Sequence, residues 1–226
     1  MTTFADQCHA IQHAGEEFLL HPQKVMYWPS RNILFVADIH VGKEHVFARQ
    51  GIGIPAGISE STLQQLFKLA TSSGASKVIV LGDFLHAVPH SDEKWLSCLS
   101  TLLTNNAHIS VEIVAGNHDR QAGRQMIDKR IIWHEGALPL APLILQHEPG
   151  IDKRGYVLCG HLHPVWRFGS RRRGSIRAPV FWFRQDYAVL PAFGEFTGGA
   201  LIDPDKYTDK LFITGPDCVI PVPANV

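Results

Sequence analysis

Short apolar runs rich in β-branched residues recur along the chain as far as Cys159, and each one favours a buried strand. The expected strands are residues 31–37, 77–81, 110–115, 142–146 and 156–159. Between the first two, apolar residues recur at helical spacing over 59–73, with Ser59 as the expected N-cap. Further helices are expected over 92–104 and from about Arg120 onward. Strands that alternate with helices predict an α/β core in which helices cover sheet faces.

The C-terminal part of the sequence has a different pattern. Residues 187–193, 200–202 and 211–214 are expected to be strands, separated by Gly, Pro and Asp turns without a convincing helix between them. They predict an antiparallel meander that forms a second sheet packed on the first. With 226 residues, 45% of them hydrophobic, the chain is long and apolar enough for one sizeable core. We therefore expect residues 1–226 to form a single domain.

Polar side chains that can bind metals follow each of the first five expected strands. In chain order they are Asp38 and His40; Asp83; Asn117, His118 and Asp119; His147; and His161 and His163. In open α/β sheets, ligands bind beyond the carboxyl ends of the strands, so these side chains are expected to meet at one edge. One such motif alone is usually only turn chemistry. Their succession at five strand ends predicts a metal site.

The order DxH, GD, GNHD, H and GHLH resembles the signature of the calcineurin-like metallophosphoesterase superfamily, from the first strand through His163. The resemblance implies an α/β fold of two packed β-sheets flanked by helices, the αββα sandwich of metallophosphoesterases. It also implies two divalent metal ions, bridged by Asp83. One ion would be held by Asp38, His40 and His163, and the other by Asn117, His147 and His161.

These ligands suit transition metals, and two such ions would catalyse the hydrolysis of a phosphate ester. Oxygen and imidazole ligands favour Mn²⁺, Zn²⁺ or Fe over Ca²⁺, and Mn²⁺ is the preferred ion here, with Zn²⁺ or Fe as alternatives. A pair of ions roughly 3.5–4 Å apart can clamp the attacking and leaving oxygens, and it lowers the pKa of water towards about 7. Hydroxide is then available at neutral pH.

The resemblance gives His118 and Asp119 catalytic roles. His118 would face the phosphate, where it would stabilise charge in the transition state or protonate the leaving oxygen. Asp119 would fix the tautomer and orientation of His118. A simple loop acid that caps the segment at Arg120 is the alternative for Asp119.

Two further histidines compete for places in the site. His134 and His147 both follow apolar runs, and either could be the single-histidine ligand. His147 is preferred because the better strand precedes it and Glu148-Pro149 ends that strand sharply. His134 is expected in a hairpin turn. His86 lies near enough to line the pocket, but a structural or surface histidine is the favoured interpretation.

The segment 167–184 follows the last expected ligand and is rich in Arg, Gly and aromatic residues. Arginine pairs with phosphate and aromatic rings stack on bases, so the segment predicts a nucleic-acid strand bound near the metals. A solvated basic loop followed by an ordinary hydrophobic strand is an equal alternative. The candidate substrate-binding residues are Arg167, Arg171, Arg172, Arg173 and Arg177.

The balance of charge limits how nucleic acid could bind. Lys and Arg number 21, and Asp and Glu also number 21, which argues against tight binding of extended duplex DNA. Any contact with a polyanion is therefore expected to be local. The aromatic face at 181–183 is expected to be exposed and could serve DNA or a homo-oligomer. The oligomeric state stays open.

Additional stretches, residues 54–57, 82–86, 190–194 and 198–199, are similar to the bacterial PdeM group of this superfamily, named as ligase-associated DNA-damage-response endonucleases. This resemblance implies cleavage of phosphodiester bonds, with single-stranded or structured DNA as the leading substrate and a link to DNA repair. One alternative is a phosphatase or phosphodiesterase for small nucleotides. The other is a non-catalytic scaffold, which the complete ligand set disfavours.

The cysteines and the N-terminus predict a cytoplasmic protein. Cys8, Cys98, Cys159 and Cys218 are widely spaced and form no CxxC pair, which predicts reduced thiols. The N-terminal residues lack the charged and apolar regions of a signal peptide. No apolar stretch approaches the length of a membrane span, so no membrane contact is expected.

Overall fold

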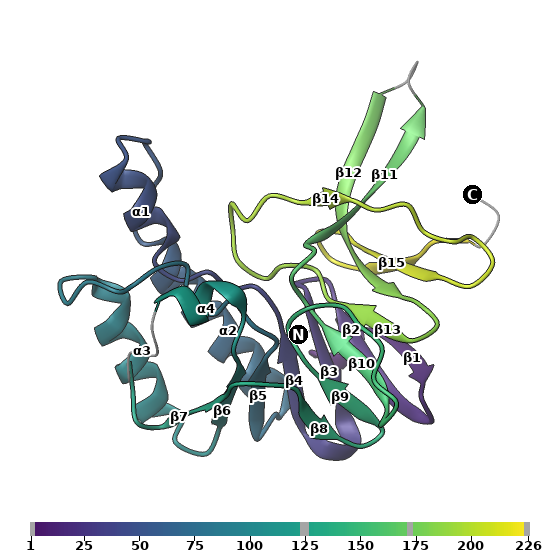
Figure 1. Ribbon diagram of the computed structural model, residues 1–226, viewed down its shortest axis with the longest axis horizontal. Coiled ribbons are helices and arrows are strands. Elements are labelled where there is room, and N and C mark those ends of the chain that lie inside the picture. Colours follow the sequence, from purple (N-terminus) through teal and green to yellow (C-terminus); the bar gives the residue numbers. More distant parts are fainter. Residues whose placement is uncertain (1–2, 123–126, 171–173, 224–226) are drawn as a thin grey trace.

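The computed structural model describes residues 3–122, 127–170 and 174–223, which form two packed β-sheets (Figure 1). The first sheet has the strand order β1-β2-β3-β4-β5-β6-β7. Its strands are β1 (His9–His13), β2 (Glu16–His21), β3 (Val25–Trp28), β4 (Ile33–Val36), β5 (Lys77–Val80), β6 (Ser110–Val114) and β7 (Ile131–His134). Strands β1 to β4 pair antiparallel, whereas β4 to β7 pair parallel. The parallel half brings the carboxyl ends of β4, β5 and β6 to one edge.

The α-helices of the described residues lie on the side of the first sheet (Figure 1). They are α1 (Lys43–Arg49), α2 (Ile58–Ser73), α3 (Lys94–Asn105) and α4 (Asn117–Ala122), and two short 3₁₀ helices span Ala5–Gln7 and Pro29–Arg31. Leucines of α2 and α3 pack on apolar side chains of β4, β5 and β6 in one buried cluster. None of the helices in the described residues combines the length and apolarity that a membrane crossing needs.

The start of α2 differs from the sequence-based expectation. Its N-cap is Gly57 in the left-handed conformation, and Ser59 lies inside the first turn. The Ser59 hydroxyl donates to the Glu44 carboxylate (2.7 Å) and accepts from the Gly42 amide (2.7 Å). Glu44 also accepts the Ser59 backbone N–H, one of the free donors of the first helical turn. The prediction of Ser59 as N-cap is therefore wrong, because this serine instead links α2 to the segment after β4.

The second sheet has the strand order β14-β11-β12-β13-β10-β9-β8, and β15 pairs with β12 and β16. The strands are β8 (Leu138–Leu140), β9 (Leu143–Leu145), β10 (Tyr156–Cys159), β11 (Pro164–Ser170), β12 (Gly174–Phe183), β13 (Tyr187–Val189), β14 (Ala200–Leu201), β15 (Lys210–Thr214) and β16 (Val219–Pro221). The predicted antiparallel meander is wrong, because β10 runs parallel to β9 and β13, and β14 runs parallel to β11. The β11–β12 hairpin projects from the body of the molecule (Figure 1).

The aromatic residues of β12 belong to the core. Phe181 and Phe183 are 0% and 3% exposed and pack between the two sheets, whereas Trp182 is 6% exposed and packs in a cluster with Val157 and Leu211. Alternate side chains of a strand point to opposite faces, which explains this division. The prediction of an exposed aromatic face at 181–183 is therefore wrong, for base stacking and for a homo-oligomer alike.

The α/β fold of two packed sheets with helices is confirmed, and so are the five strands that precede the predicted ligands. The expected strands at 187–193 and 200–202 form only in part, as β13 and β14. The strands that were not predicted include β1, β2, β3, β7, β8, β11 and β16. Helix α4 begins at Asn117 rather than near Arg120, so the GNHD motif itself opens the helix. All four cysteines are free thiols.

Candidate metal centre

The loops after β4, β5, β6, β9 and β10 converge where the two sheets meet. Within the first sheet, the His40 amide donates to the Asp83 carbonyl (2.9 Å). Within the second, the Gly160 amide donates to the His147 carbonyl (3.0 Å). Between the sheets, the His161 amide donates to both carboxylate oxygens of Asp38, at 3.1 and 2.9 Å. Backbone hydrogen bonds thus fix the relative positions of the predicted ligands.

The first group of side chains that could hold an ion is Asp38, His40 and His163, whose nearest ligand atoms lie within 4.8 Å of one another. Nε2 of His163 lies 3.5 Å from Oδ1 of Asp38. Its other ring nitrogen, Nδ1, lies 3.0 Å from the Thr197 carbonyl oxygen, which can accept only an N–H. That contact fixes the proton on Nδ1 and leaves the Nε2 lone pair directed into the group.

The second group is Asp83, His147 and His161. Nε2 of His147 lies 3.4 Å from Oδ2 of Asp83 and 3.0 Å from Nδ1 of His161. Oδ1 of Asn117 lies 3.0 Å from the same His147 nitrogen. Nδ1 of His147 donates to the Leu81 carbonyl (3.0 Å), so Nε2 is the ring nitrogen that faces the group. Two imidazoles, a carboxylate and an amide oxygen therefore point at one position.

Asp83 lies between the two groups. Its Oδ2 is 3.8 Å from His40 Nε2 and 3.4 Å from His147 Nε2. Its Oδ1 accepts the backbone N–H of His118 (2.9 Å). Burial acts to raise the pKa of Asp83, but the hydrogen bond and charge of His147, with smaller contributions from His118 and His40, lower it to about 2. A carboxylate in this position is ionised and faces both groups, which is what a bridging ligand requires.

His40 provides a direct test of whether the site suits a cation. Its Nε2 is buried and has no hydrogen-bond partner among the described residues. Burial lowers the pKa of His40 to about 2, so the ring is neutral and offers a lone pair. Buried polar atoms in folded proteins nearly always have a partner, and a metal ion would be that partner here. The set of carboxylate, amide and imidazole donors fits two ions of the Mn²⁺, Fe or Zn²⁺ type.

Several predicted ligands adopt a backbone conformation that is unusual for residues other than glycine. Positive φ angles occur at Asp38 (53°), His40 (51°), Asp83 (49°), His161 (73°) and His163 (46°). Asp and His tolerate this region better than most residues, yet each position still costs energy. Such strain gathers at functional sites, where the surrounding structure imposes it.

Two motif glycines are required by close packing of the ligands. A Cβ atom at Gly82, whose φ is +84°, would clash with the ring of His147. A Cβ atom at Gly116 would clash with the carboxylate and backbone of Asp83. The glycine before each of these ligand motifs therefore makes room for a ligand from another strand.

His118 lies at the start of α4 with one ring nitrogen already bonded. Its Nδ1 donates to the His86 carbonyl (2.9 Å), which leaves Nε2 for other partners. Its ring is stacked on that of His86 (centroids 4.9 Å apart) and meets the ring of His40 edge-on (4.9 Å). His118 thus adjoins the first metal-binding group without being oriented by Asp119.

Asp119 holds two loops together. Its buried carboxylate accepts the backbone N–H groups of Phe84 (3.2 Å), Leu85 (2.7 Å) and Gly116 (2.9 Å). It therefore ties the loop after β5 to the start of α4. The Gly116 contact caps the helix that contains Arg120, as one sequence-based alternative expected, whereas the His86 carbonyl rather than Asp119 orients His118. Its catalytic role stays a prediction.

Of His134 and His147, the two histidines that compete in the sequence, only His147 lies in the candidate site. His134 ends β7 rather than lying in a turn, and its Nε2 is 2.7 Å from Oε2 of Glu112, away from both groups. His86, in contrast, lies in the wall of the site with its Nδ1 3.3 Å from that of His40. Burial lowers the pKa of His86 to about 4. Its position three residues after Asp83 was the only sequence signal for this placement.

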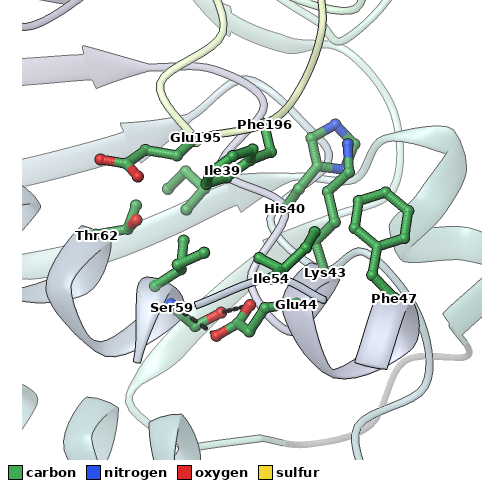
Figure 2. A pocket seen from close by; sticks show the side chains of 11 residues that line it. Ile39, His40, Lys43, Glu44, Phe47, Ile54, Ser59, Thr62, Glu195 and Phe196 are labelled. Carbon is green, nitrogen blue, oxygen red and sulfur yellow. Dashed lines mark hydrogen bonds between the residues drawn. The ribbon is translucent and has the colours of Figure 1, made fainter. Parts of the chain in front are cut away.

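Two cavities that share Phe196 adjoin the candidate site, and another lies beside His147. The first lies beside His40 and is bordered by Lys43 and Phe47 of α1 and by Phe196 (Figure 2). The second, of about 350 Å³, lies beside His163 and is also bordered by Phe196. The charge of Lys43 helps to lower the pKa of His40, although burial is the larger cause. Sequence reasoning identified neither Lys43 nor Phe196 as part of the site.

Only part of the predicted substrate-binding set can be placed. Arg167 on β11 and Arg177 on β12 are directly opposite each other in the hairpin, and both are exposed. β11 begins immediately after His163, so the hairpin leads away from the site. The other three predicted residues, Arg171, Arg172 and Arg173, lie outside the described residues.

Comparisons with known proteins agree on the family. The family model described as calcineurin-like phosphoesterase matches residues 31–220. The crystal structure of Pseudomonas putida nuclease MPE superposes with a TM-score of 0.82 at 35% sequence identity, covering 95% of this chain and 100% of that chain. No curated protein matches the sequence.

Two further solved structures are similar at a lower level. The phosphoesterase YfcE from E. coli has a TM-score of 0.41 and 16% identity, covering 85% of this chain and 93% of its own. The protein of unknown function AQ665 from Aquifex aeolicus has a TM-score of 0.39 and 19% identity, covering 57% and 77%. Similarities at this level support no inference about the function of this chain.

Proposed function

The chain belongs to the calcineurin-like phosphoesterase family, and from this premise we propose that it hydrolyses phosphodiester bonds at a centre of two divalent metal ions. The observation that carries the proposal is the position of Asp83, whose carboxylate faces His40 on one side and His147 on the other. We propose Mn²⁺ as the ion, with Zn²⁺ or Fe as alternatives. The lone pairs of the surrounding histidines support a transition metal, without distinguishing among these three.

The ligand roles proposed for the side chains follow their two groups. Asp38, His40 and His163 would hold one ion, Asn117, His147 and His161 the other, and Asp83 both. When bound, the two ions would supply Lewis-acid activation of water and neutralise charge on the phosphate.

His118 is proposed as the proton donor to the leaving oxygen. Because its Nδ1 is bonded to the His86 carbonyl, only Nε2 is left to hold and donate a proton. The stacked ring of His86 and the edge of His40 limit its rotation. The same Nε2–H can stabilise negative charge that develops on the phosphate oxygens.

Single-stranded or structured DNA is the proposed substrate. The solved structure that is 35% identical over nearly the whole chain is that of a nuclease, which supports this choice. The hairpin arginines also support it, because like charges at directly opposite positions of a β-ladder repel each other. A phosphate backbone beside Arg167 and Arg177 would relieve that repulsion. A link to DNA repair is proposed on the resemblance to the PdeM group.

A paired assay with Mn²⁺ tests the proposal. Wild type, Asp83→Asn and His118→Ala are compared on bis-(p-nitrophenyl) phosphate and on a single-stranded oligonucleotide. Wild type should cleave both, and Asp83→Asn should cleave neither. His118→Ala should lose about 10²–10⁴-fold on the oligonucleotide, because a general acid contributes this much, and less on the ester with the better leaving group.

The outcomes separate the alternatives. Cleavage of the small diester alone would indicate a phosphodiesterase for small substrates. Absence of turnover with any divalent ion, in protein shown to contain two metals, would contradict the enzymatic function and favour a scaffold. Retained activity in Asp83→Asn would refute the bridging role.

A further inference from the structure

Phe196 is an exposed aromatic residue at the rim of the candidate metal centre. Its side chain is 56% exposed, and it borders two of the cavities that adjoin the site, one beside His40 and one beside His163. Figure 2 shows it above the cavity that His40, Lys43 and Phe47 also line. Of the aromatic residues that the sequence offered for base stacking, those at 181–183 are buried, whereas Phe168 on the projecting hairpin is 37% exposed.

The backbone at Phe196 is strained in a way that local sequence does not explain. Its φ is 57°, a left-handed value that is a genuine outlier for a bulky residue. Phe193, three residues earlier, is buried instead: its side chain is 3% exposed and packs in the core beneath the helices. Strain of this kind persists only where the surrounding structure imposes it, and it gathers at ligand-binding positions.

The loop that carries Phe196 is fixed on both sides of it. Before Phe196, the amides of Phe193 and Gly194 donate to the carbonyls of Ala37 (2.8 Å) and Asp38 (3.0 Å). After it, the Thr197 carbonyl accepts the His163 Nδ1–H (3.0 Å). The backbone on both sides of Phe196 is therefore fixed relative to two predicted metal ligands, Asp38 and His163.

We propose that Phe196 is a stacking platform for the nucleobase next to the scissile phosphate of a single-stranded nucleic acid. This inference rests on the proposed function, because it assumes that a phosphodiester occupies the metal centre. Single-strand binding proteins combine aromatic platforms with positive charge along the backbone. Lys43 supplies that charge across the first cavity, where its ammonium lies 5.6 Å from the centre of the Phe47 ring.

The decisive experiment measures the coupling between the Phe196 ring and a base of the ligand. Dissociation constants are determined by fluorescence anisotropy for a short thymidine oligonucleotide and for the same backbone with abasic residues. Cleavage of both oligonucleotides by wild type is followed with Mn²⁺. Base removal should weaken binding to wild type by roughly 5- to 150-fold, the range for loss of one stacked base. Base removal should weaken binding to Phe196→Ala by much less, because the ring is already absent.

Matched variants separate stacking from a general loss of apolar surface. Phe196→Trp should keep the preference for bases, whereas Phe196→Leu should lose it as Phe196→Ala does. Tyr207→Ala removes another exposed aromatic residue, which lines none of the cavities beside the site. This variant should bind both oligonucleotides as wild type does.

The two proposals fail in different ways. Cleavage by wild type with the same base preference in wild type and Phe196→Ala would overturn the stacking role and leave the nuclease function standing. If base removal weakens binding to wild type much more than to Phe196→Ala, but no oligonucleotide is cleaved, the result would support the platform and contradict the proposed catalysis. Equal loss of binding to both oligonucleotides in Phe196→Ala would also overturn it, because the ring would then act through loop structure.

Discussion

The two sheets contribute chemically different parts of the candidate metal centre. The first sheet contributes both carboxylates, Asp38 and Asp83, and each accepts backbone N–H groups, from His161 and His118 respectively. The second sheet contributes only imidazoles, two of which are oriented by backbone carbonyls. The negative charge that would hold the two proposed cations therefore comes from the first sheet alone, and the second sheet would add neutral ligands around it.

The first sheet also orients ligands of the second. The Leu81 carbonyl at the end of β5 fixes the ring of His147 from β9, and Asp38 after β4 holds the backbone of His161 after β10. The centre is therefore complete only when the sheets are packed. The comparison leads us to expect that loss of a charged residue and loss of a neutral ligand have different consequences, even around one ion.

The largest expected effect comes from Asp38 and His163, a matched pair around the same proposed ion. Asp38→Asn should lower kcat/KM by more than about 100-fold. That loss exceeds the loss of about 10- to 100-fold that is typical when a residue that only orients a metal ligand is removed. Excess Mn²⁺ should not restore the activity, because the charge that attracts the ion is gone. His163→Ala removes a neutral ligand at the rim, so high Mn²⁺ should restore much of its activity. Hydrolysis of bis-(p-nitrophenyl) phosphate is measured against Mn²⁺ concentration, with metal content determined in parallel.

His90→Ala, which removes an exposed loop histidine, is the control for general loss of an imidazole. Equal losses of kcat/KM in Asp38→Asn and His163→Ala, with equal recovery at high Mn²⁺, would contradict the expectation that charged ligands of the first sheet and neutral ligands of the second contribute differently.

The sequence predicted which residues meet in the candidate site because the identity of each residue after a strand is encoded locally. A buried strand needs a run of apolar residues, so polar ligands are found after the strand rather than within it. Asp83 after β5 and His161 after β10 are examples. The convergence of the ligands at one edge was predicted from the strand ends, whereas their division into two groups came from the resemblance to the superfamily. Orientation could not be predicted, because it depends on carbonyls far along the chain, such as Leu81 for His147.

Other features could not be predicted for related reasons. Strands β1 and β2 contain polar and charged residues at alternate or adjacent positions, and their pairing with each other gives no signal in either segment alone. The exposures of Phe181 and Phe196 were not predictable, because each depends on which strands and loops pack against it. The charged Lys24 side chain contacts the Phe193 carbonyl across 169 positions of sequence.

The next largest effect concerns how each sheet holds its loops. Asp119→Ala leaves three buried backbone N–H groups of the first sheet without an acceptor, and it should lower the free energy of unfolding by about 3–5 kcal/mol. Lys24→Met removes one hydrogen bond to the Phe193 carbonyl, in the loop after β13, and should cost about 1–2 kcal/mol. Urea denaturation followed by circular dichroism measures both. A larger loss in Lys24→Met would show that the loop of the second sheet is the more dependent on a single side chain.

The smallest expected effect tests a buried carboxylate of the first sheet that lies away from the site. Glu112 on β6 contacts Lys77 on β5 and His134 on β7. Burial acts to raise the pKa of Glu112, but these two partners lower it below its usual value.

A depressed pKa means that the carboxylate stabilises the fold above about pH 4.3, the unfolded value, and that this contribution is lost as the pH falls through the lower folded pKa. Because Lys77 and His134 are partly exposed, Glu112→Gln should cost only about 1–2 kcal/mol at pH 7, and the difference from wild type should shrink below pH 4. The exposed Asp152–Arg154 pair between β9 and β10 provides the second-sheet control, and Asp152→Asn should cause no measurable change. Denaturant titrations at pH 7 and pH 3.5 measure the free energy of unfolding of wild type and of both variants. A Glu112→Gln difference that is independent of pH would show that shape and hydrogen bonding, rather than charge, hold β5, β6 and β7 together.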